Sequence, residues 1–80
     1  MPQRLIADKV IRRELPSAKL LKLWAGYGKG RPCDGCDKPI TTTEIEHEVD
    51  LPGGVILRFH VACTGFWRLA TGNDGDGAKR

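Results

Sequence analysis

The sequence predicts a small α+β fold that is held together by one bound metal ion, and three observations lead to this fold class. The chain has only 80 residues, so an apolar core alone would give it marginal stability. Its three cysteines and one of its two histidines form two close pairs, a spacing typical of a metal site. The apolar residues repeat with a helical period before these pairs and with a strand period between them.

Two short basic amphipathic helices are expected before the first cysteine. Over residues 3–14, Ile6 and Val10 are four residues apart and share one apolar stripe, with basic side chains opposite. Pro16 interrupts this helix, and Ser17 can cap a second one that carries a run of leucines as far as Trp24. These two helices form the predicted basic arm.

A connector, a hairpin and a helix are expected next. Residues 26–32 are too rich in glycine and proline for a regular element. Residues 44–50 alternate apolar and acidic side chains, which predicts a strand with one solvated acidic face. The run 51–54 places proline before glycine, as a type II turn requires, and residues 55–59 alternate again on a returning strand.

The last element predicted is a helix over residues 60–70, with Gly72 as its stop. The predicted organisation is therefore a basic helical arm and connector over 1–32, a metal-binding module over 33–70 and a disordered tail over 71–80. No segment has the roughly 20 apolar residues that span a bilayer. With no secretory signal and an odd number of cysteines, we expect a cytoplasmic protein with no membrane contact.

The two close pairs carry the chemistry of this sequence. Cys33 and Cys36 flank a tight turn, while His60 and Cys63 lie one helical turn apart. The 23 residues between the pairs are about what a two-stranded hairpin needs. Three sulfurs and one nitrogen suit a single Zn²⁺ ion, and four protein ligands leave no position for water or substrate. We therefore expect one structural zinc, no catalysis and no small-molecule substrate, and we expect metal removal to unfold residues 33–70.

The ligand order, with the hairpin and the run Arg58-Phe59-His60 before Cys63, resembles a treble-clef zinc finger of Cys-Cys-His-Cys type. It is similar to the first zinc module of LIM domains and to the zinc fingers of poly(ADP-ribose) polymerases, which sense DNA breaks. The further cysteines of a LIM domain are missing, and Thr64-Gly65 separates the last ligand from the Phe66-Trp67 pair. The glycine-rich connector before Cys33 also resembles small bacterial proteins of unassigned function, which implies no activity.

The charge of +3 is distributed unevenly along the chain. Residues 1–32 carry eight basic and two acidic side chains, whereas residues 33–63 carry two basic and six acidic ones. A basic arm can follow a phosphate backbone, so DNA or RNA is the leading expected partner. The basic residues proposed to contact it are Arg4, Lys9, Arg12, Arg13, Lys19, Lys22, Lys29 and Arg31.

An adaptor that binds proteins, or a homodimer, is the alternative interpretation. It would use the acidic hairpin and an apolar helix surface. That surface would consist of Leu5, Leu20, Leu21, Leu23 and Trp24. His47 shares one face of the predicted strand with Ile45 and Val49, so we expect a half-buried strand residue rather than a fifth metal ligand.

Overall fold

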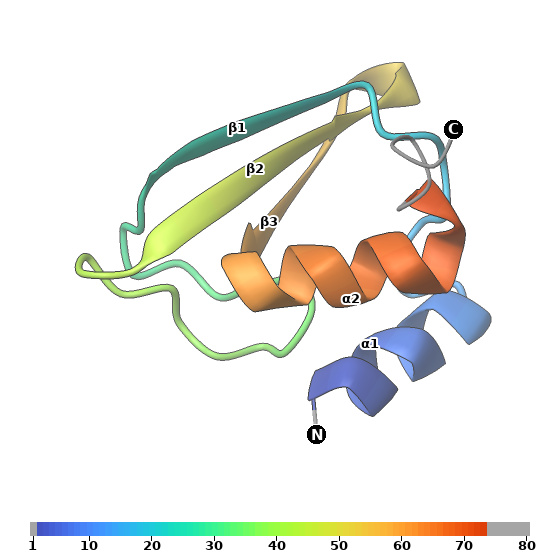
Figure 1. Cartoon of the computed structure of the whole chain (residues 1–80), viewed down its shortest axis with the longest axis horizontal. Helices are drawn as coiled ribbons and strands as arrows, with labels where there is room; N and C mark the ends of the chain where they lie inside the picture. Colours follow the sequence, from blue (N-terminus) through green and yellow to red (C-terminus); the bar gives the residue numbers. More distant parts are fainter. Residues whose placement is uncertain (1, 74–80) are drawn as a thin grey trace.

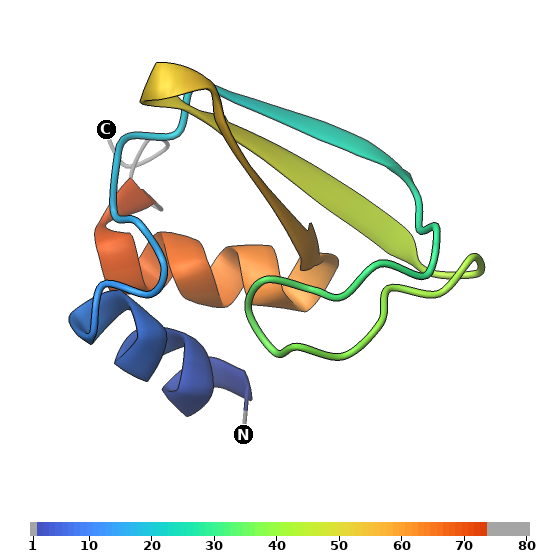
Figure 2. The same cartoon turned by 180° about the vertical axis from the view of Figure 1, so that it is seen from behind.

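The structure, a computed structural model, describes residues 2–73 and contains two helices and one antiparallel sheet of three strands. The elements are α1 (Pro2–Ile11), β1 (Lys22–Tyr27), β2 (Ile45–Leu51), the 3-10 turn η1 (Pro52–Gly54), β3 (Val55–His60) and α2 (Val61–Thr71). Strand β2 is central, and α2 lies between α1 and the sheet (Figures 1 and 2). No helix in the described part of the chain has the length and apolar character needed to cross a bilayer.

Most of the predicted elements are present. The first helix ends at Ile11, three residues earlier than expected. Strands β2 and β3 form the predicted hairpin, and Gly53 has φ 81° and ψ 13°, the values of the third residue of a type II turn. Helix α2 is capped at its C-terminus by Gly72, the predicted stop, which adopts the left-handed conformation and donates its N–H to the Arg68 carbonyl.

The prediction of a second basic helix through Trp24 is wrong. Residues 12–21 contain no helix, and Lys22–Tyr27 is a strand that pairs with β2, from Lys22 opposite Asp50 to Tyr27 opposite Ile45. The connector is therefore shorter than expected, because Gly26 and Tyr27 belong to β1. The sheet thus joins residues from both sides of the boundary drawn between residues 32 and 33.

The core lies between the inner face of the sheet and the two helices. The Phe59 and Trp67 rings have centroids 5.8 Å apart, which connects β3 to α2. Trp67 also donates its indole N–H to the Pro16 carbonyl at 2.9 Å. The buried apolar side chains are Ile6, Leu15, Ile40, Val49, Leu51, Leu57, Phe59 and Trp67.

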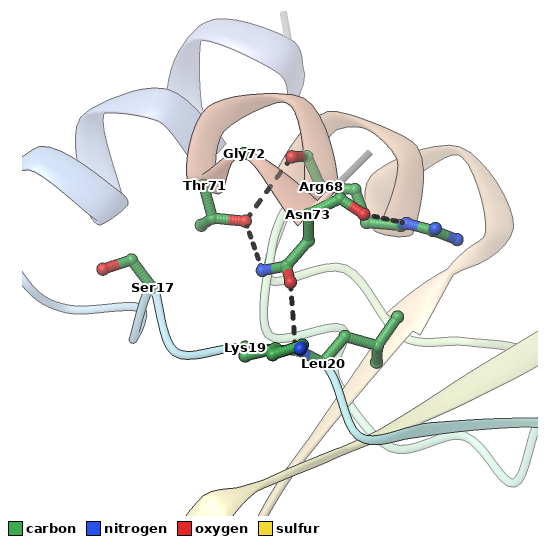
Figure 3. A pocket seen from close by; sticks show the side chains of 7 residues that line it. All are labelled: Ser17, Lys19, Leu20, Arg68, Thr71, Gly72 and Asn73. Carbon is green, nitrogen blue, oxygen red and sulfur yellow. Dashed lines mark hydrogen bonds between the residues drawn. The ribbon is translucent and has the colours of Figure 1, made fainter. Parts of the chain in front are cut away.

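Asn73 also holds the segment that leads from α1 to β1 against the end of α2 (Figure 3). Asn73 Oδ1 accepts the Leu20 N–H at 2.9 Å, and Asn73 Nδ2 donates to the Ala18 carbonyl at 3.0 Å. The tail predicted to be disordered begins at residue 71, but Thr71 is the last residue of α2. The rest of that prediction, residues 74–80, lies outside the described residues.

Candidate metal centre

The first pair of candidate ligands lies on a turn between β1 and β2. Cys33 donates its N–H to the Lys38 carbonyl at 2.8 Å, and its own carbonyl accepts the Asp37 N–H at 2.9 Å. Asp37 reverses the chain with φ 70°, a conformation that aspartate tolerates better than most residues. We refer to residues 33–38 as the knuckle, because this turn directs two cysteines to one point.

The second pair lies where β3 passes into α2. His60 is the last residue of β3 and also the N-cap of α2, with φ −61° and ψ 156°. Cys63 follows in the first turn of α2 and is 3% exposed. The strand and the helix therefore hold the imidazole and the thiol at fixed positions relative to the knuckle.

The structure brings these four predicted residues together at one point. One ligand atom from each of Cys33, Cys36, His60 and Cys63 lies within 4.8 Å of all the others. Cys36 Sγ is 3.3 Å from His60 Nδ1. Two such atoms at the edge of a tetrahedron around zinc would be about 3.5 Å apart, given typical Zn–S and Zn–N bond lengths. The four side chains are therefore close enough to coordinate one metal ion.

The far side of the imidazole is also held in place. His60 Nε2 is 3.1 Å from the Pro39 carbonyl oxygen, which can only accept a hydrogen bond. The hydrogen is therefore assigned to Nε2, and the lone pair of Nδ1 faces the sulfurs. Glu44 Oε1 lies 3.4 Å from the same Nε2. The Thr41 N–H donates a hydrogen bond to Glu44 Oε1, and this bond lowers the pKa of the Glu44 carboxyl.

The thiol groups of Cys33 and Cys63 are buried, that of Cys36 is partly exposed, and Cys33 receives backbone hydrogen bonds. Cys33 is 1% exposed, and its Sγ accepts the N–H groups of Gly35 at 3.3 Å and His60 at 3.4 Å. The pKa of Cys63 is raised, first by burial and then by the negative charge of the neighbouring sulfurs. With four side chains around one point, a single ion would have no open coordination position.

Helix α1 packs directly on the knuckle through its apolar stripe and Lys9. A Cβ atom added to Gly35 would lie 2.9 Å from Ile6 Cδ1, so only glycine allows the helix to come this close. Lys9 Nζ donates to the Asp34 carbonyl at 3.1 Å and to Asp37 Oδ1 at 2.7 Å. Helix α1 therefore supports the candidate metal centre.

The eight basic residues predicted to contact nucleic acid do not lie on two helices, because only Arg4 and Lys9 belong to α1. Lys22 lies in β1 with its ammonium 5.1 Å from the centroid of the Trp24 ring. Arg31 pairs with Glu46 at 3.3 Å. The other four, Arg12, Arg13, Lys19 and Lys29, are exposed residues of the loops on either side of β1.

The acidic face of β2 is only partly solvated, because the prediction fails at Glu46. Glu46 is 7% exposed, and its Oε2 lies 3.3 Å from Arg31 and 3.7 Å from Arg58. His47 is half-buried, as predicted, and its Nδ1 shares a hydrogen bond of 2.9 Å with Thr64 Oγ1. Burial, and then the charge of Arg68, lower the pKa of His47.

Comparisons of the chain with protein-family models, with curated proteins and with solved structures give no significant match. Function is therefore inferred from the geometry described above.

Proposed function

We propose that this protein is a zinc-stabilised binding module in which Cys33, Cys36, His60 and Cys63 hold one structural Zn²⁺ ion in a treble-clef arrangement. The observation that carries this proposal is the convergence of three sulfurs and one imidazole nitrogen within 4.8 Å. Thiolate ligands favour zinc over the hard cations magnesium and calcium, and four protein ligands are typical of structural zinc sites. The order of knuckle, hairpin and helix supports the treble-clef assignment.

Metal analysis of the purified protein tests this assignment. We expect about one zinc per chain. His60→Ala should lower this ratio strongly, whereas His47→Ala should retain it, because His47 bonds to Thr64 and is not a member of the cluster. A wild-type ratio near zero in protein purified without chelator, or equal losses in the two variants, would contradict the proposal.

The proposed binding target is nucleic acid. Residues 1–32 carry a net charge of +6, and exposed cations can neutralise phosphates. Five of the eight residues predicted to contact nucleic acid are exposed. Within residues 2–73, four of these five form no salt bridge, and the fifth, Arg12, lies 3.9 Å from Glu14. The residues that we propose to contact nucleic acid are therefore Arg4, Arg12, Arg13, Lys19 and Lys29. Lys9 and Arg31 instead stabilise the fold.

The dependence of affinity on salt tests this part. Binding to duplex DNA or single-stranded RNA should weaken steeply as salt rises, and Arg13→Gln should reduce the slope of log K against log salt by about 1. Lys38→Gln removes one charge outside the proposed surface and should leave the slope unchanged. No binding to either nucleic acid at low salt would contradict this function while leaving the zinc assignment intact.

A further inference from the structure

The outer strands of the sheet differ in how their free edges are covered. Beside β3, the Asp34 N–H donates to the Arg58 carbonyl at 2.7 Å, and the Arg58 N–H donates to Asp34 Oδ2 at 2.8 Å. The knuckle thus occupies that edge. No backbone hydrogen bond from the described residues occupies the outer edge of β1, and Figure 1 shows this strand at the margin of the fold. Such an open edge is a template for another strand.

The register identifies the backbone groups at this edge. Gly28 donates to the Glu44 carbonyl at 2.9 Å, and bonded pairs alternate along an antiparallel ladder. The even-numbered residues of β1 therefore bond to β2. The N–H and C=O groups of Leu23, Ala25 and Tyr27 point away from the sheet and are available to a further strand.

Large apolar side chains surround these free groups. Leu21 is 58% exposed, Trp24 is 53% exposed and Tyr27 is 71% exposed. Two of these residues lie in β1 and Leu21 directly precedes it. So many exposed apolar side chains are more than solubility requires, and edges of this kind are usually protected by charge or proline. The composition of β1 therefore favours association.

The missing side chain of Gly26 leaves an open notch on the surface of β1, next to the buried carboxylate of Glu46. Gly26 lies opposite Glu46, and a Cβ atom added to Gly26 would meet nothing within 4 Å. Both residues line a hollow of about 300 Å³ beside Trp24. Glu46 Oε1 is buried and has no hydrogen-bond partner among the described residues, although Oε2 faces two arginines. An unpartnered buried oxygen beside an open notch favours a donor from outside.

We propose that β1 pairs antiparallel with β1 of a second copy of this chain, with the two Trp24 side chains facing each other at the twofold axis. In this register Leu23 bonds to Ala25 of the second copy, and Ala25 bonds to its Leu23. Lys22 lies opposite Gly26 of the second copy. Because Gly26 is paired with Glu46 on β2, Glu46 of the second copy is the next residue in the same cross-strand row. Two strand spacings, about 10 Å, separate the Lys22 and Glu46 backbones, and extended lysine and glutamate side chains together cover this distance.

Charge complementarity is the reason for choosing a second copy as the occupant. Within one chain the Lys22 ammonium lies 5.1 Å from the centroid of the Trp24 ring. In the dimer it extends instead to the notch of the other copy, where the unpartnered carboxylate oxygen lies. The register also covers Trp24 with Trp24, and aromatic pairs across strands are stabilising. The interface is small, so we expect a dissociation constant in the micromolar range.

Sedimentation velocity on the zinc-loaded chain over a range of concentrations tests this dimer. We expect Ala25→Pro to abolish it, because proline removes an N–H that points outward and leaves the bonds to β2 intact. Lys22→Gln should raise the dissociation constant about tenfold, since each dimer contains two such charge pairs, while Lys38→Gln should not change it. A monomer at every concentration up to about 1 mM, or a dimer that tolerates Ala25→Pro, would overturn the proposal.

Amide hydrogen exchange gives a second measurement that needs no variant. The amides of Leu23 and Ala25 should become protected as the concentration rises, whereas those of Trp24 and Gly26 are already bonded to β2. A dimer in which Leu23 and Ala25 exchange freely would overturn the register. Zinc content and nucleic-acid binding are measured separately, so failure here is distinct from failure of the proposed function.

Discussion

Gly35 is the residue at which the N-terminal helix meets the knuckle, and its missing side chain decides how closely they pack. A methyl group there would lie 2.9 Å from Ile6 Cδ1 and 3.3 Å from Cys63 Cβ. Both neighbours are fully or nearly fully buried and have little room to move. The contact therefore depends on glycine for space.

We predict that Gly35→Ala lowers the free energy of unfolding by about 1–3 kcal/mol through overpacking. Urea denaturation of the zinc-loaded protein measures this loss. Gly65→Ala is the matched control, because the added methyl group at Gly65 meets nothing within 4 Å and lies inside α2. Alanine is the better helix former, so this control should gain about 0.5–1 kcal/mol. Equal losses in both variants would contradict the packing argument.

His47 should make stability depend on pH. Its pKa in the folded protein lies below the ordinary 6.5, first because of burial and then because of Arg68. Between that lowered pKa and 6.5, the unfolded chain binds more protons than the folded one, so stability falls as the pH drops below 6.5. The stability of the wild type relative to His47→Gln should therefore decrease between pH 7.5 and 5.5. Protonation of the four candidate metal ligands affects both proteins and cancels in this difference. A constant difference would contradict the prediction.

Lys9 and Glu46 show what sequence patterns miss at the level of single residues. The helical period places Lys9 opposite the apolar stripe, but in the structure its side chain is only 11% exposed and donates to Asp37, which lies 28 residues later in the sequence. The strand period likewise puts Glu46 on the outer face. That face is solvated only if nothing covers it, and here Arg31 and Arg58 both lie within 4 Å of the Glu46 Oε2 atom, at 3.3 Å and 3.7 Å.

At the level of elements, β1 shows how tertiary pairing overrides local preference. The leucines and Trp24 recur at spacings that suit a helix, and leucine and lysine are good helix formers. The same residues also alternate, with Leu23 half-buried on the inner face and Trp24 exposed on the outer one. Pairing with β2 decides between the two patterns, and no local signal reports that pairing. The hairpin and α2 were predictable because turn and cap residues bound them.

Asn73 should determine how firmly the segment between α1 and β1 is held. Asn73→Ala removes the bonds to the Leu20 N–H and the Ala18 carbonyl, which should cost about 1–2 kcal/mol. Hydrogen exchange should accelerate at the Leu20 amide and remain slow in β2. Ser17→Ala, an exposed change in the same segment, is the control. Unchanged exchange at Leu20 in Asn73→Ala would show that this side chain does not hold the segment.

At the scale of the whole molecule, the candidate metal centre connects every layer of the fold. The ligand spacing was enough to predict which four residues converge, because a knuckle and a helical turn are local structures. The contacts that surround them are long-range. Ile6 and Lys9 reach the knuckle from α1, and Pro39 and Glu44 reach His60 from the chain between β1 and β2. No spacing rule predicts such contacts, because they depend on how the layers pack.

This connection leads to a prediction about metal removal. Removal of the proposed zinc ion from residues 33–38 and from the β3–α2 junction should unfold α1 as well, although α1 contains no candidate ligand. Its buried Ile6 packs on Gly35, its Lys9 bonds to Asp34 and Asp37, and a helix of 10 residues is marginal by itself in water. Chelation should therefore abolish the helical circular dichroism signal and the amide protection of both helices together, and zinc addition should restore them. Persistent protection of α1 after chelation would show that the helix folds independently of the knuckle.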